Sequence, residues 1–159
     1  MSDTEIAPAE APIKLRVQLP VPPLTIWQMW TNPEQVSTWL AASATIEPRL
    51  GGAFELFWDE TPEHNSTLGC TVTAIEPYTR LSFTWRGPEH LESLMPAGST
   101  AVELRFTGDH LTSTLYLHHT GWGSGQDWAE AREWQVEAWK NALGGLKALV
   151  EMAQQMAKT

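Results

Sequence analysis

The chain has 159 residues, enough for one domain, since folding at this size buries roughly 68–70% of the surface of the unfolded chain. Its formal net charge of −9 disfavours nucleic acid and anionic membranes as partners, because both normally require a basic patch. The single cysteine, Cys70, cannot form an internal disulfide, so we expect a protein of the reducing cytoplasm.

The N-terminal part predicts a tail, a strand and two short helices. Residues 1–12 are small and acidic, which predicts a disordered tail rather than a signal peptide. Residues 13–19 alternate apolar and polar side chains, as a half-buried strand does. The prolines that follow favour a short helix to about Trp30, and Asn32 and Pro33 suit the start of a second one. These prolines also interrupt the longest uncharged run, so no membrane insertion is expected.

The middle of the chain predicts an antiparallel meander of three hairpins, because short apolar runs alternate with turn residues. The expected strand pairs are 45–50 with 53–58, 69–75 with 80–86, and 101–107 with 111–119. In the first hairpin, Gly51 and Gly52 would form a two-residue turn with both glycines at positive φ. The connection 87–99 carries apolar residues at helical spacing and forms either a one-turn lid over the sheet edge or a loose loop.

The last third predicts one amphipathic helix, which begins near residues 124–128 and runs to the end. Gly144 and Gly145 lie inside it, and each costs about 1 kcal/mol relative to alanine. Either a close approach of the sheet or space for a ligand compensates for them, or the helix breaks there. The whole order is strand, two short helices, six strands and a long helix, which indicates a single α+β domain over residues 13–159.

Four landmarks carry a family resemblance. They are W-Q-M-W-T-N-P-E-Q-V-S-T-W-L at 27–40, G-G-A-F at 51–54, G-C-T-V-T-A-I-E-P-Y-T-R-L-S-F-T-W at 69–85 and W-K-N-A-L-G-G-L-K at 139–147. Their order resembles the family named after the activator of the heat-shock-chaperone ATPase, within the START-like (SRPBCC) superfamily. The resemblance covers about residues 13–152. It implies a helix-grip fold, in which a six- or seven-stranded antiparallel sheet curves around the C-terminal helix and leaves a cavity between them.

Nine tryptophans are the most unusual feature of the composition. Each brings a large apolar surface and one N–H that needs a partner when buried, so they either fill the core or line a cavity for an aromatic or lipid-like ligand. We interpret Trp27, Trp30 and Trp39 as packing residues. The expected cavity lining combines inward-facing strand residues with residues of the last hairpin's exit and the helix: Phe54, Leu56, Trp58, Cys70, Val72, Phe83, Trp85, Leu104, Leu117, His119, Trp122, Trp139 and Leu143.

Cys70 and His119 are the polar exceptions in this lining. A thiol and an imidazole can act as nucleophile and base, but no third orienting group is identifiable, and a lone buried cysteine usually packs as a small apolar residue. His118 and His119 point to opposite faces of a strand and cannot share a metal ion without a bulge. We therefore predict no catalytic residue, no metal site and no cofactor.

Three hypotheses for the function follow. The favoured one is a cytoplasmic binding protein for a small hydrophobic or aromatic ligand, which requires a void of several hundred cubic ångströms. The resemblance implies a second, a co-chaperone or stress-response protein that contacts a heat-shock chaperone. Relatives that activate the chaperone resemble this chain in their C-terminal part and carry a further N-terminal domain. A cyclase or hydrolase, known among superfamily relatives, is the third, and it requires a titratable group in the cavity.

Overall fold

The computed structural model describes residues 10–157, and most of the expected N-terminal tail lies outside them. The described part is an α+β domain with the predicted element order. Its elements are β1 (Ile13–Leu19), α1 (Pro23–Thr31), α2 (Pro33–Val36), β2 (Ser43–Ile46), β3 (Phe54–Phe57), β4 (Val72–Glu76), β5 (Arg80–Trp85), a 3-10 helix (Glu89–Leu91), β6 (Thr100–Gly108), β7 (Ser113–Thr120) and α3 (Gln126–Ala157).

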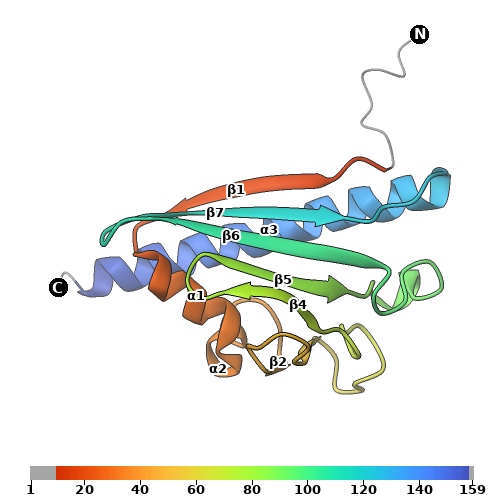
Figure 1. Cartoon of the computed structure of the whole chain (residues 1–159), viewed down its shortest axis with the longest axis horizontal. Coiled ribbons are helices and arrows are strands. Elements are labelled where there is room, and N and C mark those ends of the chain that lie inside the picture. Colours follow the sequence, from red (N-terminus) through yellow and green to blue (C-terminus); the bar gives the residue numbers. More distant parts are fainter. Residues whose placement is uncertain (1–9, 158–159) are drawn as a thin grey trace, which may run out of the picture.

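The main sheet is antiparallel and has five strands in the order β1-β7-β6-β5-β4. Its central register pairs Leu81 with Leu104 and Leu104 with Leu117, so these buried side chains form one row across the inner face. Helix α3 runs along the sheet, and α1 and α2 lie at one end of it (Figure 1). This arrangement confirms the expected helix grip.

The expected sheet of six or seven strands is wrong, because β2 and β3 form a separate two-stranded sheet. Isolated bridges and single backbone hydrogen bonds, such as that from the amide of Phe54 to the backbone oxygen of Cys70 at 2.9 Å, connect β3 to the segment before β4. Between those bridges the side chain of Thr67 replaces a backbone acceptor: the amide of Leu56 donates to Thr67 Oγ1 at 2.8 Å. A side chain in the ladder prevents continuous backbone pairing, so β3 does not join the main sheet.

The predicted two-residue turn between β2 and β3 is also wrong. The strands end at Ile46 and resume at Phe54, which leaves residues 47–53 as a longer loop. Gly51 has a positive φ of 79°, as expected, whereas Gly52 is not among the positive-φ glycines. Gly52 is required for another reason, since a Cβ there would lie 2.2 Å from the backbone oxygen of Glu47. Close backbone approach excludes every larger residue.

Helix α1 and the short α2 meet at Asn32. Its Oδ1 accepts a hydrogen bond from the amide of Glu34 at 2.9 Å, and Pro33 occupies the first helical position. This is the N-cap that the sequence predicts. Upstream, Trp30 is fully buried, and the centroid of its ring lies 6.2 Å from that of Trp139. This contact joins α1 to α3 through the core.

Helix α3 is continuous through Gly144 and Gly145, so no break occurs there. Its buried residues recur at steps of three and four, and they are Ala131, Gln135, Trp139, Leu143, Leu146 and Val150. Both glycines lie on the opposite, exposed side, where an added Cβ would meet nothing within 4 Å. Neither a close approach of the sheet nor space for a ligand therefore explains them.

The connection 87–99 forms a short 3-10 turn that is packed down rather than loose. The side chain of Met95 is fully buried, and its backbone oxygen accepts a hydrogen bond from the amide of Gly87 at 2.9 Å. A Cβ on Gly87 would lie 2.8 Å from that of Met95, so the close contact requires glycine. The connection thereby fixes the position of the residues that directly follow β5.

Candidate functional site

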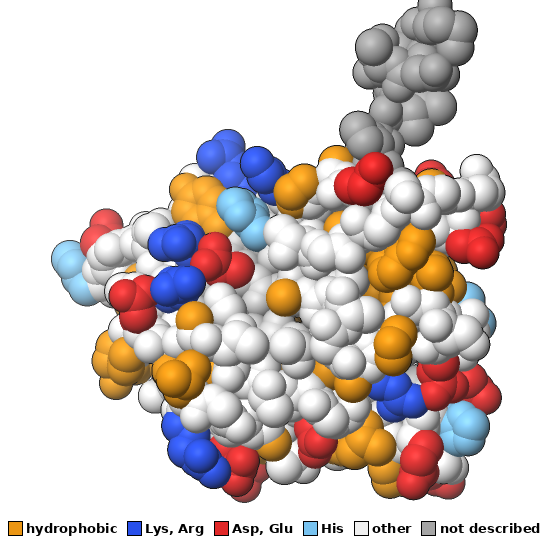
Figure 2. Space-filling view, turned by 45° about the vertical axis from the view of Figure 1, so that its right-hand side comes forward, with side chains coloured by type: hydrophobic (Ala, Val, Ile, Leu, Met, Phe, Trp, Pro, Cys, Tyr) orange, Lys and Arg blue, Asp and Glu red, His pale blue; other side chains and the backbone are white. Residues whose placement is uncertain are grey.

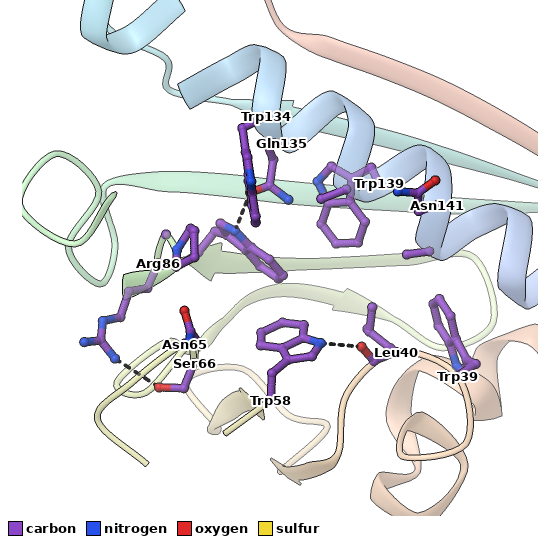
Figure 3. A pocket seen from close by; sticks show the side chains of 15 residues that line it. Trp39, Leu40, Trp58, Asn65, Ser66, Arg86, Trp134, Gln135, Trp139 and Asn141 are labelled. Carbon is purple, nitrogen blue, oxygen red and sulfur yellow. Dashed lines mark hydrogen bonds between the residues drawn. The ribbon is translucent and has the colours of Figure 1, made fainter. Parts of the chain in front are cut away.

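A cavity of about 490 Å³ lies between α3, the end of β5 and the connections that follow α2 and β3. Figure 3 shows α3 along one wall and the two connections on the opposite side. The lining is mainly apolar and consists of Trp39, Leu40, Trp58, Asn65, Ser66, Trp85, Arg86, Gly87, Pro88, Trp134, Gln135, Ala138, Trp139, Asn141 and Ala142.

Five of the nine tryptophans of the chain line this cavity. Trp85 and Trp139 form the buried part of the wall, with ring centroids 5.0 Å apart. Trp58 meets Trp85 edge to face at 6.1 Å. Trp58 and Trp134 are each 42% exposed, so part of the lining lies at the protein surface. Aromatic faces in this number favour a flat apolar ligand.

Hydrogen bonds inside the protein hold the tryptophans on the connections. The indole N–H of Trp39 donates to the backbone oxygen of Met29 at 2.9 Å. That of Trp58 donates to the backbone oxygen of Leu40 at 2.6 Å, a bond drawn in Figure 3. With their single polar groups satisfied, these side chains turn apolar ring surface toward the cavity.

The indole of Trp139 is held by His119, a fully buried residue of β7. The N–H of Trp139 donates to His119 Nδ1 at 3.0 Å, so the proton of the neutral imidazole is on Nε2. Nε2 lies 2.8 Å from Thr100 Oγ1 and donates to it. Burial lowers the pKa of His119 to about 3, so the ring is neutral at physiological pH. His119 therefore positions a cavity wall and carries no charge.

Arg86 closes the polar end of the cavity. Its guanidinium donates to Ser66 Oγ at 3.0 Å and to the backbone oxygen of Glu63 at 2.8 Å, and it forms an ion pair with Glu92. The side chain is only 13% exposed. Because these acceptors occupy the guanidinium, Arg86 ties the β3–β4 connection to the segment after β5 and offers no free cation to an anionic ligand.

The comparison with protein families decides the identity of this fold. The model of the family "Activator of Hsp90 ATPase homolog 1-like protein" matches residues 20–151, which is most of the chain. The chain belongs to this family. The resemblance seen in the sequence landmarks is thereby confirmed. No curated protein sequence matches the chain.

Solved structures share the fold at low sequence identity. Protein MLL2253 from Mesorhizobium loti is 21% identical, has a TM-score of 0.72, and the alignment covers 89% of this chain and 98% of that one. The Aha1 dimer from Colwellia psychrerythraea is 16% identical with a TM-score of 0.70, covering 89% and 96%. PFC0360w, an HSP90 activator from Plasmodium falciparum, is 16% identical with a TM-score of 0.67, covering 88% and 96%.

Among the site residues expected from the sequence, this member of the family brings three to the cavity: Trp58, Trp85 and Trp139. The other ten are buried and do not line it. They are Phe54, Leu56, Cys70, Val72, Phe83, Leu104, Leu117, His119, Trp122 and Leu143. These residues do not line the cavity because they pack against one another. The rings of Phe54 and Phe83, for example, stack with their centroids 3.8 Å apart and fill the space under the sheet.

Cys70 and His119 do not form a nucleophile–base pair. Both nitrogens of His119 are engaged by Trp139 and Thr100, so neither is free to accept a thiol proton. Burial also raises the pKa of the Cys70 thiol, which disfavours the reactive thiolate. Within residues 10–157, no cluster of three or more histidine, cysteine or carboxylate side chains could hold a metal ion. Nor is any helix in this range long and apolar enough to cross a membrane.

Several lining residues were missed because they lie outside the central strands. Trp39, interpreted as packing, lines the cavity from the connection after α2. Trp134 and Gln135 lie in the N-terminal third of α3. Gln135 could have been predicted from the sequence, because it is the polar member of a buried helical stripe. Its neighbours in that stripe, Ala131 and Trp139, are each four residues away along the helix.

Proposed function

We propose that the protein binds a small aromatic or hydrophobic molecule in this cavity. The observation that carries the proposal is the grouping of five tryptophans around a space of about 490 Å³. That volume falls within the range of about 300–1,000 Å³ that is common for small-molecule sites. A cytoplasmic location is part of the proposal and is supported by the single cysteine, which cannot form an internal disulfide.

The expected affinity for a simple probe can be worked out. Fluorene is flat, apolar and has thirteen carbon atoms. At about 0.5 kcal/mol per non-hydrogen atom, a value within the range for small ligands, its binding free energy is about −6.5 kcal/mol. This corresponds to a Kd on the order of 10 µM. Trp85 and Trp139 lie in the wall, so binding should change the intrinsic fluorescence.

The test is a fluorene titration of wild type and of Ala138→Phe, with corrections for probe absorbance. Ala138 lines the cavity, and a phenyl ring there would occupy the ligand's space. We expect the affinity to fall by about tenfold or more, equivalent to 1.4 kcal/mol or more. Ala148→Phe on the exposed side of the same helix is the matched control and should bind as wild type does. Equal affinities for all three proteins, or no binding to wild type, would contradict the proposal.

A second candidate is a co-chaperone or stress-response role, which the family description favours. PFC0360w, similar in fold, is described as an HSP90 activator. Such a role would use an outer surface rather than the cavity. A stimulation of a heat-shock chaperone's ATPase that is equal for wild type and Ala138→Phe would support it. Catalysis is less favoured, because the cavity lining contains no carboxylate, histidine or cysteine.

The surface charge is consistent with a small uncharged ligand. On the face of the described residues in Figure 2, acidic and basic side chains are interspersed with hydrophobic ones, without a broad basic area. The net charge of −9 opposes long-range attraction of an anion. These observations support an uncharged small molecule over a nucleic acid as the partner.

A further inference from the structure

The wall of the cavity contains one buried amide, the side chain of Gln135. It projects from α3, is only 3% exposed and is part of the cavity lining. Its Oε1 accepts a hydrogen bond from the indole N–H of Trp85 at 3.3 Å, drawn as a dashed line in Figure 3. One polar group among tryptophans is the kind of feature that fixes a ligand's orientation.

The bond to Trp85 determines which end of the amide is free. An indole N–H is a donor only, so the atom of Gln135 that faces it must be the oxygen. The amide nitrogen, Nε2, is therefore on the other side. It has no hydrogen-bond partner within residues 10–157 and is not among the fully enclosed polar atoms, so it reaches the space of the cavity. An apolar ligand that covered this donor would leave it without a partner at a desolvation cost, which a ligand acceptor would remove.

The other polar side chains of the lining are engaged or less enclosed than Gln135. Asn65 is half-buried, and its Oδ1 accepts a hydrogen bond from the amide of Glu89 at 2.8 Å. Ser66 Oγ donates to the backbone oxygen of Pro62 at 2.6 Å and accepts from Arg86. The guanidinium of Arg86 is paired with Glu92. The side chain of Asn141 is exposed. Gln135 is thus the buried polar side chain of the lining whose donor has no partner within residues 10–157, and a bound molecule can reach it.

We propose that the ligand is a flat apolar molecule with a neutral hydrogen-bond acceptor, such as a ketone or quinone carbonyl, which Gln135 Nε2 binds. This inference rests on the proposed binding function and specifies its ligand class. A carboxylate is disfavoured because no unpaired cation lines the cavity, and a plain hydrocarbon would leave the amide donor unsatisfied.

The test compares 9-fluorenone with fluorene, which share one ring skeleton and differ by the carbonyl. Each is titrated into wild type and into Gln135→Met, whose side chain has a similar length and no N–H donor. We expect the substitution to weaken fluorenone by about fivefold, as the loss of one hydrogen bond does, and to change fluorene by less than about twofold. The change in the ratio of the two Kd values isolates the carbonyl contact.

Gln135→Met also leaves the indole N–H of Trp85 without its acceptor. A second variant is therefore needed to separate this effect from the loss of the contact with the ligand. The double variant Trp85→Phe with Gln135→Met removes both partners of the bond and leaves no buried indole N–H unpaired there. It should show the same loss of preference for fluorenone. An unchanged preference in both variants would overturn the assignment of Gln135, while continued fluorene binding would leave the proposed function standing. Failure of both probes to bind wild type would overturn the function itself.

Discussion

The buried imidazole of His119 makes the stability of this protein depend on pH in a predictable direction. Its pKa is about 3 in the folded protein, against 6.5 for an unperturbed histidine. As the pH falls below 6.5, the unfolded chain binds a proton that the folded protein does not bind. Stability therefore decreases between pH 6.5 and pH 3 and is fully present above that range.

The size of the effect follows from 1.36 kcal/mol per pH unit. Between pH 7 and pH 5 the free energy of unfolding should fall by about 2 kcal/mol through His119 alone. Over the whole interval down to the folded-state pKa, the loss is on the order of 4 kcal/mol. Carboxylates also begin to titrate near pH 5, so a comparison with a variant that lacks His119 is needed.

The assay is urea denaturation at pH 7 and pH 5, followed by tryptophan fluorescence, for wild type and His119→Gln. The variant should be less stable at pH 7, because Trp139 and Thr100 lose well-placed partners, and should lack the additional loss at pH 5. His118→Gln, which changes the neighbour on the other face of β7, is the matched control and should keep that loss because His119 is still present. If wild type lost no more stability than His119→Gln between the two pH values, the neutral buried imidazole would be refuted.

Two further predictions separate the cavity from the core and test the helix glycines. Trp58→Ala should weaken fluorene binding several-fold with a small change in melting temperature, because Trp58 lines the cavity and is 42% exposed. Leu117→Ala should cost about 2–5 kcal/mol of stability and leave the affinity of the folded fraction unchanged, as expected for a filled core position. If Trp58→Ala lowered the stability without changing the affinity, or if Leu117→Ala weakened fluorene binding by the folded fraction, the assignment of Trp58 to the cavity and of Leu117 to the core would be wrong. Gly144→Ala and Gly145→Ala should each stabilise α3 by about 1 kcal/mol in thermal melts, since a Cβ there meets open space. Destabilisation by either would show that the glycine has a role that the fold does not reveal.

The elements that the sequence predicted best depend on local chemistry. The alternation in β1 corresponds to the strand Ile13–Leu19, and Asn32 caps α2 through its own side chain. The elements predicted least well depend on contacts between distant residues. The separate β2–β3 sheet follows from Thr67, and the loop 47–53 follows from the approach of Gly52 to a backbone oxygen. Neither contact has a local signature.

The same difference between local patterns and contacts of distant residues explains which parts of the candidate site could be predicted. Alternation along the strands correctly identified buried residues such as Phe83, but burial does not separate a filled core from a cavity wall. The free space is located where connections meet α3, and the position of Trp39 there depends on the path of the chain after α2. Gln135 could have been noticed as a polar residue on an apolar helical stripe, although its bond to Trp85 requires the folded structure.

A crystal structure of the protein with 9-fluorenone would test the central claim most directly. We expect the probe in the cavity, with its rings against Trp85 and Trp139 and its oxygen within about 3 Å of Gln135 Nε2. An empty cavity at saturating probe, or a probe bound only elsewhere on the surface, would show that the cavity is not a binding site for such molecules.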